Sequence, residues 1–147
     1  MGHLFSCSSD KKHKNINTNS NSKIKKMHMI VDDSLLNRLV LKKFLEDNNY
    51  NVIDLNSAEE CLEEIKKTNN YSIIWIDIRL EQMNGIECTK ILRNDLNYTN
   101  AIIGITSHVD YDSIEACKKA GMNNVIAKPI IREEIYNCAK KYELNQN

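Results

Sequence analysis

Short apolar runs alternate with amphipathic segments along most of this chain. The run at residues 71–76 (YSIIWI) is almost entirely apolar, which is typical of a strand buried on both faces of a sheet. Runs of this kind predict strands over residues 27–31, 51–55, 71–76, 101–105 and 125–127. Between them, apolar residues recur three and four positions apart, which predicts helices over residues 34–48, 58–65, 85–93, 112–120 and 130–142.

Polar residues mark the ends of several predicted helices. Ser34 and Ser57 each precede a helical segment, where a hydroxyl accepts a hydrogen bond from a free N–H group of the first turn. Glu60 follows Ser57 by three residues and completes a capping box. Gly121 follows the segment 112–120 and ends it, because glycine adopts the left-handed conformation at little cost.

The alternation of strands and helices predicts an α/β fold. Parallel strands need crossover connections, and helices in those connections cover both faces of the sheet. We therefore expect a flavodoxin-like, doubly wound sheet of five parallel strands in the order 2-1-3-4-5, with five helices. This domain would occupy residues 26–143, after a disordered basic N-terminal segment (1–25) and before a short tail (144–147).

The formal net charge of zero hides an asymmetry. Residues 1–28 carry six lysines against Asp10 alone, a net charge of +5, and the other 119 residues carry a net charge of −5. The first 25 residues contain too few large apolar side chains to offset the entropy of ordering them. No run approaches the ~20 apolar residues of a membrane-spanning helix. Without a recognition fold or interleaved aromatic residues, the lysines predict no specific nucleic-acid partner.

The five cysteines lie far apart and form no CxxC pair. Their spacing argues against a structural zinc site or a disulfide framework and predicts a reducing, cytoplasmic location. Four of them fall one per predicted helix, on or beside its apolar face. We expect these four to fill the core, as we expect of Trp75 in the central strand. They are Cys61, Cys88, Cys117 and Cys138.

Polar residues of chemical interest stand where four predicted strands end. They are Asp32 and Asp33, then Asp77, Thr106 and Lys128. The carboxyl ends of parallel strands meet at one edge of the sheet, so we expect these side chains to lie together. Three neighbouring carboxylates repel unless a cation joins them, and such oxygen ligands suit Mg²⁺ or Mn²⁺. A carboxylate can attack phosphorus, while a divalent ion, an ammonium and a hydroxyl neutralise the transferred group.

Taken singly, each of these residues is more often an ordinary surface or turn residue, and Asp33 is a candidate helix cap. Their joint occurrence in this order indicates phosphoryl transfer. The motifs resemble those of response-regulator receiver domains of two-component phosphorelays, over residues 27–142. Asn37-Arg38 resembles the receivers of hybrid histidine kinases in particular. The matching motifs are Val31-Asp32-Asp33, Ile76-Asp77, Met83-Asn84-Gly85, Ile105-Thr106-Ser107 and Lys128-Pro129.

The resemblance implies that Asp77 accepts a phosphoryl group from a phosphohistidine of a histidine kinase or histidine phosphotransfer protein. It implies Mg²⁺ ligation by Asp33, Asp77 and the backbone carbonyl of Arg79, with Asp32 acting through water. Lys128 would pair with the acyl phosphate, and Thr106 would bind one of its oxygens. The family also has a cis peptide bond at the position of Lys128-Pro129, and X-Pro is the one bond type in which cis costs little.

On this interpretation the protein is not an enzyme, since it catalyses only its own phosphorylation and dephosphorylation. It would be a single-domain response regulator that contacts an unknown downstream protein, through the face around the fourth helix, the fifth strand and the fifth helix. Val125 replaces an aromatic residue that moves inward in many receivers, so a different signalling route is needed. The positions that tune acyl-phosphate lifetime carry Arg79 and His108, and a bulky Arg79 would shield phosphorus from water.

Two other functions compete with this one. A degenerate pseudo-receiver would keep the fold as a binding module without phosphorylation, but the complete set of acids, Thr106 and Lys128 argues against it. A magnesium-dependent phosphatase of the haloacid-dehalogenase type also uses an aspartate after a strand. That class needs a second acid two residues later, where this chain has Arg79.

The N-terminus is a candidate site of membrane attachment. Residues 1–6 (MGHLFS) fit the N-myristoylation pattern, with Gly2 as the acceptor, and Cys7 is a candidate palmitoylation site. One myristoyl chain binds membranes weakly, so a second acyl chain or the nearby lysines would be needed for stable anchoring. These features predict contact with the inner leaflet through a tethered N-terminus.

Overall fold

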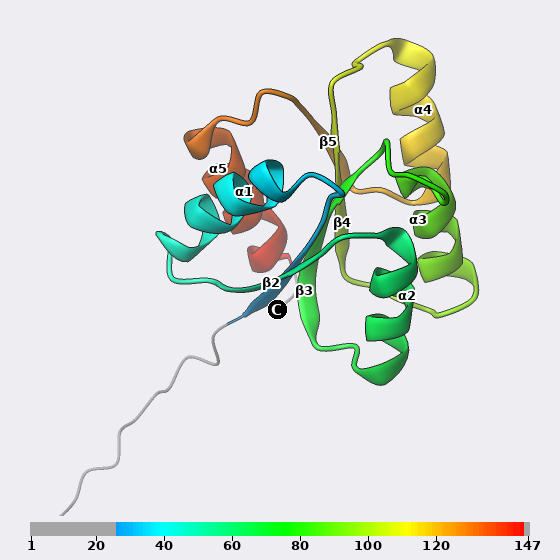
Figure 1. Cartoon of the computed structure of the whole chain (residues 1–147), viewed down its shortest axis with the longest axis horizontal. Coiled ribbons are helices and arrows are strands. Elements are labelled where there is room, and N and C mark those ends of the chain that lie inside the picture. Colours follow the sequence, from blue (N-terminus) through cyan, green and yellow to red (C-terminus); the bar gives the residue numbers. More distant parts are fainter. Residues whose placement is uncertain (1–25, 146–147) are drawn as a thin grey trace, which may run out of the picture.

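The computed structural model describes residues 26–145. Five parallel strands form one sheet in the order β2-β1-β3-β4-β5, as the sequence predicted (Figure 1). The predictions for residues 1–25, including lipidation at Gly2 and Cys7, and those for residues 146–147 lie outside the described residues. The strands are β1 (Met27–Val31), β2 (Asn51–Leu55), β3 (Tyr71–Asp77), β4 (Ala101–Thr106) and β5 (Asn124–Ala127).

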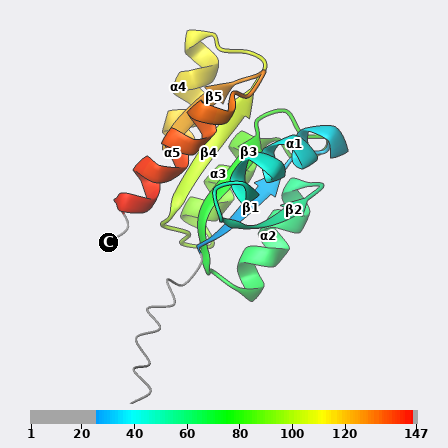
Figure 2. The same cartoon turned by 90° about the vertical axis from the view of Figure 1, so that its left-hand side faces the viewer.

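Five helices cover the two faces of the sheet. Figures 1 and 2 show α1 and α5 on one face and α2, α3 and α4 on the other. Each face has its own buried apolar cluster, so the sheet separates two cores. This is the doubly wound arrangement that crossover connections impose. The helices are α1 (Leu35–Glu46), α2 (Ala58–Lys67), α3 (Gly85–Asn94), α4 (Tyr111–Ala120) and α5 (Arg132–Leu144).

The helix ends follow local chemistry. The hydroxyl of Ser34 accepts from the N–H of Asn37, and that of Ser57 accepts from Glu60. Gly121 ends α4 with a left-handed φ of 110°, as predicted. The last helix begins at Arg132, two residues later than predicted, because Ile131 keeps an extended backbone and supplies no side-chain cap.

The strand register brings the predicted site residues to one edge of the sheet. Val31 pairs with Ile76, so Asp32 and Asp77 emerge side by side at the ends of β1 and β3. Thr106 pairs with Ala127, which places Lys128 at the neighbouring strand end. The sheet therefore gathers residues that lie far apart in the sequence.

The buried core confirms the predictions for Trp75, which is fully buried, and for all four cysteines of the domain. It also holds a polar residue that the sequence did not indicate. His28 in β1 is fully buried and bonds to Trp75 on one side and to Glu143 on the other. Within residues 26–145, no helix is long and apolar enough to cross a membrane.

Candidate functional site

Three carboxylates converge at the carboxyl edge of the sheet. One oxygen each of Asp32, Asp33 and Asp77 lies within 4.8 Å of the others. Asp32 and Asp77 are buried, with 5% and 6% of their surfaces exposed, whereas Asp33 is exposed. This arrangement fits a hard divalent cation, because such ions take oxygen ligands and keep several waters. The prediction that these three acids lie together is therefore confirmed.

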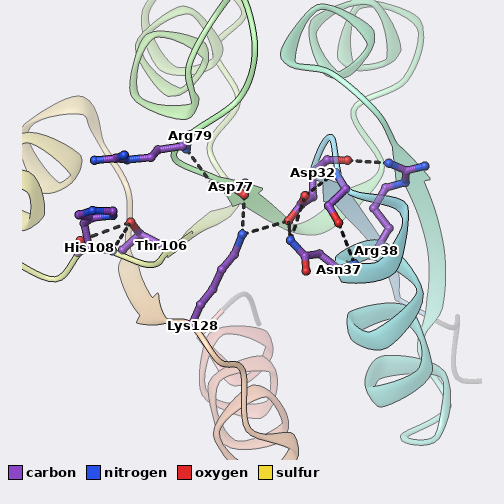
Figure 3. Close-up of polar contacts among 9 residues, drawn as sticks. Asp32, Asn37, Arg38, Asp77, Arg79, Thr106, His108 and Lys128 are labelled. Carbon is purple, nitrogen blue, oxygen red and sulfur yellow. Dashed lines mark hydrogen bonds and ion pairs between the residues drawn. The ribbon is translucent and has the colours of Figure 1, made fainter.

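Lys128 reaches into this acidic group from the end of β5. Its Nζ lies 2.6 Å from Oδ2 of Asp77 and 3.5 Å from Oδ2 of Asp32 (Figure 3). Burial lowers the pKa of Lys128, but the two carboxylates outweigh burial and raise that pKa above its ordinary value. The side chain is thus an ammonium held between two acids.

The loop after β3 holds Asp77 from the other side. The backbone N–H of Arg79 donates to Oδ1 of Asp77 at 2.8 Å. Burial raises the pKa of Asp77, while the Lys128 ammonium and the Arg79 N–H oppose that rise. The N–H of Gly85 donates to the carbonyl of Ile78 at 2.9 Å, so the loop folds back against the end of β3. The Arg79 N–H and the Lys128 ammonium therefore hold the two oxygens of the Asp77 carboxylate.

Thr106 stands at the same edge but bonds within its own loop. Its buried hydroxyl donates to the carbonyl of His108 at 3.3 Å and accepts from the N–H of His108 at 3.1 Å. Figure 3 shows this hydroxyl apart from the pair of Asp77 and Lys128. The exposed side chain of Arg79 extends toward the β4–α4 loop in the same view.

Two residues at the site have contacts that the sequence did not reveal. The side-chain amide of Asn37 donates to both oxygens of Asp32, at 3.4 Å and 3.2 Å. The guanidinium of Arg38 donates to the backbone carbonyl of Asp32 at 2.8 Å. In the sequence, the dipeptide Asn37-Arg38 indicates only a resemblance to one group of receivers. Asp32 precedes α1 and stands five and six residues before Asn37 and Arg38, so no helical spacing in the sequence signals either contact.

An apolar cavity of about 450 Å³ lies beside the acidic group. It runs between α1 and the segment that follows β5, and Asp32, Asp77 and Lys128 form part of its lining. Its apolar lining includes Trp75 of β3 together with residues of α1 and residues after β5, among them Leu36, Val40, Leu41, Pro129 and Ile130. A partner that approaches Asp77 from this side would meet apolar surface.

The fold and the site together define a doubly wound α/β domain with an acidic, lysine-containing site at its switch point. A family model, "Response regulator receiver domain", matches residues 29–140. The chain belongs to the response-regulator receiver family. The family resemblance and the fold predicted from the sequence are both confirmed.

The curated relatives include large sensor kinases. The chain is 31% identical over 112 residues, 73% of its length, to the osmosensing histidine protein kinase SLN1 of Saccharomyces cerevisiae. It is 29% identical over 119 residues, 78% of its length, to the sensory/regulatory protein RpfC of Xanthomonas campestris pv. campestris. The chain spans only 9% and 16% of those two proteins.

Solved structures match over most of both chains. A two-component response regulator from Clostridium difficile superposes with a TM-score of 0.77 at 26% identity, over 84% of this chain and 99% of that one. The Vibrio cholerae chemotaxis protein CheY4 superposes with a TM-score of 0.75 at 23% identity, over 80% and 98% of the two chains. The latter similarity shows the shared fold.

Proposed function

We propose that this chain takes a phosphoryl group from a phosphohistidine onto Asp77 and signals through protein contacts. The observation that carries this proposal is the contact of 2.6 Å between the Lys128 ammonium and the Asp77 carboxylate, in a group of three converging acids. Relatives that are named as histidine kinases support a phosphohistidine donor, from a histidine kinase or a phosphotransfer protein.

Asp77 is a nucleophile held in place. In the transfer, a carboxylate oxygen forms a bond to phosphorus while the phosphorus–nitrogen bond of the donor breaks. The imidazole nitrogen of the donor keeps the electron pair and takes up a proton. Lys128 already lies beside Asp77 and neutralises charge on the transferred oxygens. The Thr106 hydroxyl, once released from His108, would supply a further donor.

The acidic group fits Mg²⁺. Asp33 and Asp77 would hold the ion together with the backbone carbonyl of Arg79, and Asp32 would act through water. The Asp33 side chain makes no hydrogen bond or ion pair with any residue of the described range 26–145, so its oxygens are free to ligate. When bound, the ion would neutralise phosphate oxygens that the three carboxylates would otherwise repel.

The surface of α1 supports docking of the donor beside Asp77. Leu35, Leu36 and Leu39 are 60%, 70% and 53% exposed, and Leu36 also lines the cavity that leads to Asp77. Exposed leucines in one group indicate a protein contact, because their burial against a partner removes apolar surface from water. The occupant we propose is an apolar helix face of the donor, which would pack along α1 and bring its imidazole over Asp77.

Phosphoramidate tests the proposal, because its phosphorus–nitrogen bond resembles that of phosphohistidine. With Mg²⁺, intact-mass analysis should show one added phosphoryl group, which Asp77→Asn abolishes and the surface control Asp95→Asn retains. A protein that gains no phosphoryl group would be a pseudo-receiver, and one that hydrolyses many equivalents would be a phosphatase; either result contradicts the proposal.

The donor surface is tested with a phosphorylated histidine phosphotransfer protein. Leu39→Glu should slow transfer from this protein at least about tenfold more than it slows labelling by phosphoramidate, since central apolar contacts carry most interface energy. The matched control is Leu144→Glu, at the exposed end of α5. Equal effects of Leu39→Glu on both donors would place the docking surface elsewhere.

A further inference from the structure

Residues at the start of α1 hold Asp32 by hydrogen bonds to both the side chain and the backbone of that aspartate. The Asn37 amide nitrogen lies 3.4 Å from Oδ1 and 3.2 Å from Oδ2 of Asp32, so it spans the carboxylate. The N–H of Ser34 donates to Oδ1 at 2.8 Å. The Arg38 guanidinium donates to the Asp32 carbonyl. Asp32 therefore has little freedom to rotate (Figure 3).

The residues of α1 that hold Asp32 are themselves fixed by further hydrogen bonds and ion pairs. Arg38 donates from Nε to Asp54 of β2 at 3.1 Å, and Lys42 donates to the same carboxylate at 2.9 Å. The N–H of Asn37 donates to the Ser34 hydroxyl that caps the helix, at 3.4 Å. Asn37 is thus fixed relative to the strand edge by the helix cap and by the ion pairs to β2. A donor fixed in this way can set the orientation of Asp32.

The orientation of Asp32 matters because Lys128 lies between two acids. Its ammonium is 2.6 Å from Asp77 and 3.5 Å from Oδ2 of Asp32, the oxygen that is closer to the Asn37 amide. A buried carboxylate that loses a hydrogen-bond donor forms a contact with another donor within reach, because an uncompensated buried charge costs free energy. Lys128 is the nearest ammonium, so Asp32 without Asn37 would draw it away from Asp77.

We propose that Asn37 is a positioning residue. Its hydrogen bonds keep the Asp32 carboxylate from competing for Lys128, so that the Lys128 ammonium remains paired with Asp77. Its effect on phosphoryl transfer rests on the proposed function, but its effect on Lys128 does not. Asn37 touches neither Asp77 nor the transferred group and acts only through Asp32. Asn37, in the first turn of α1, thus has a role at the functional site.

The direct test observes the Lys128 ammonium by lysine-selective NMR in protein free of Mg²⁺. Asn37→Ala should shift the Lys128 signal, whereas the control Asn48→Ala should not. Asn48, which follows the end of α1, also donates its amide, to the carbonyl of Phe44 at 2.9 Å, at the opposite end of that helix from Asp32. Asn37→Ala should cause no further shift in an Asp32→Asn background, measured against Asp32→Asn alone, because the competing charge is then gone. A Lys128 signal that Asn37→Ala leaves in place would overturn the proposal.

A second variant separates positioning from folding. Asn37→Leu keeps the approximate size of the side chain, removes the donor, adds no charge beside the Asp32 carboxylate and has the higher helix propensity. Phosphorylation by phosphoramidate at saturating Mg²⁺ should fall about tenfold in Asn37→Leu and Asn37→Ala, the factor expected for one hydrogen bond to a charged group. Mg²⁺ affinity should not fall in Asn37→Leu, since Asn37 is not one of the proposed ligands.

The outcomes distinguish the two proposals. A wild-type protein that takes up no phosphoryl group contradicts the proposed function, and the Lys128 signal then still decides the role of Asn37. A normal transfer rate in Asn37→Leu, or a lower rate that more Mg²⁺ restores, would show that Asn37 does not position Lys128.

Discussion

The Lys128 ammonium lies 2.6 Å from Oδ2 of Asp77, a contact between residues 51 positions apart in the sequence. It joins the end of β5 to the end of β3 across the strand β4 that lies between them. The contact neutralises the Asp77 carboxylate in the free protein. It also leaves an ammonium where phosphate oxygens would arrive.

Replacement of Lys128 should therefore block transfer. Lys128→Met keeps the length of the side chain and removes its charge, and we expect the phosphorylation rate with phosphoramidate to fall about 10²-fold or more. Intact-mass time courses measure this rate. Lys118→Met is the matched control, because within residues 26–145 the Lys118 side chain pairs only with Glu115, at 3.7 Å on the surface. Equal rates in the two variants would remove Lys128 from the mechanism.

Asp33 should govern metal affinity with little effect on folding. Asp33→Asn is expected to weaken Mg²⁺ binding about tenfold or more, since it removes one of the proposed carboxylate ligands. The free energy of unfolding should change by less than about 0.5 kcal/mol, because the side chain is exposed and unpaired within residues 26–145. Titration of Mg²⁺ against Trp75 fluorescence measures the first quantity and urea unfolding the second. Addition of EDTA should stop phosphorylation of the wild type.

Gly85 has no room for a side chain. A Cβ atom there would collide with the backbone carbonyl oxygen of Asp77 and would lie 3.0 Å from Cα of Ile78. We expect Gly85→Ala to lower the free energy of unfolding by about 1–3 kcal/mol, as overpacking does. The collision is with the backbone of the acceptor residue, so phosphorylation should slow as well. Lys90→Ala serves as the control, since Lys90 is an exposed residue of the same helix, α3. Unchanged stability in Gly85→Ala would show that this loop is loosely packed.

His28 links the core to the end of α5. Its Nδ1 accepts from the Trp75 indole at 3.2 Å, its Nε2 lies 3.0 Å from Oε1 of Glu143, and its ring stacks on Tyr50. Burial lowers the pKa of His28, while Glu143 opposes that change and Lys26 adds to it. Burial and Glu143 together raise the pKa of Tyr50 to about 12.

This lowered pKa makes stability depend on pH. Above the ordinary histidine value of 6.5, His28 is neutral in both the folded and the unfolded chain. Below it, the unfolded chain takes up a proton that the folded chain resists, so stability should fall as the pH drops from 6.5 toward 5. Urea unfolding at several pH values should show a weaker dependence in His28→Gln than in the wild type. Parallel pH profiles for the two proteins would contradict this account.

The periodicity of the sequence predicted much of the fold. Strand positions and most helix starts followed from apolar spacing and from caps such as Ser34 and Gly121, and the strand order was expected from the flavodoxin-like arrangement of such a sheet. The start of α5 was missed, because apolar spacing cannot distinguish the extended Ile131 from a helical residue. The polar residues at the strand ends were also predicted, since the carboxyl ends of parallel strands must meet.

Side-chain partnerships depended on the tertiary structure. Local spacing does not reveal that Asn37 spans the carboxylate of Asp32, or that Lys128 lies closer to Asp77 than to Asp32. The pairing of His28 with Trp75 and Glu143 joins residues 47 and 115 positions apart. The sequence alone determined which strands form and which residues reach the edge of the sheet, because backbone periodicity sets both. Only the packed structure decided which donor faces which acceptor, because that choice depends on distances between elements remote in sequence.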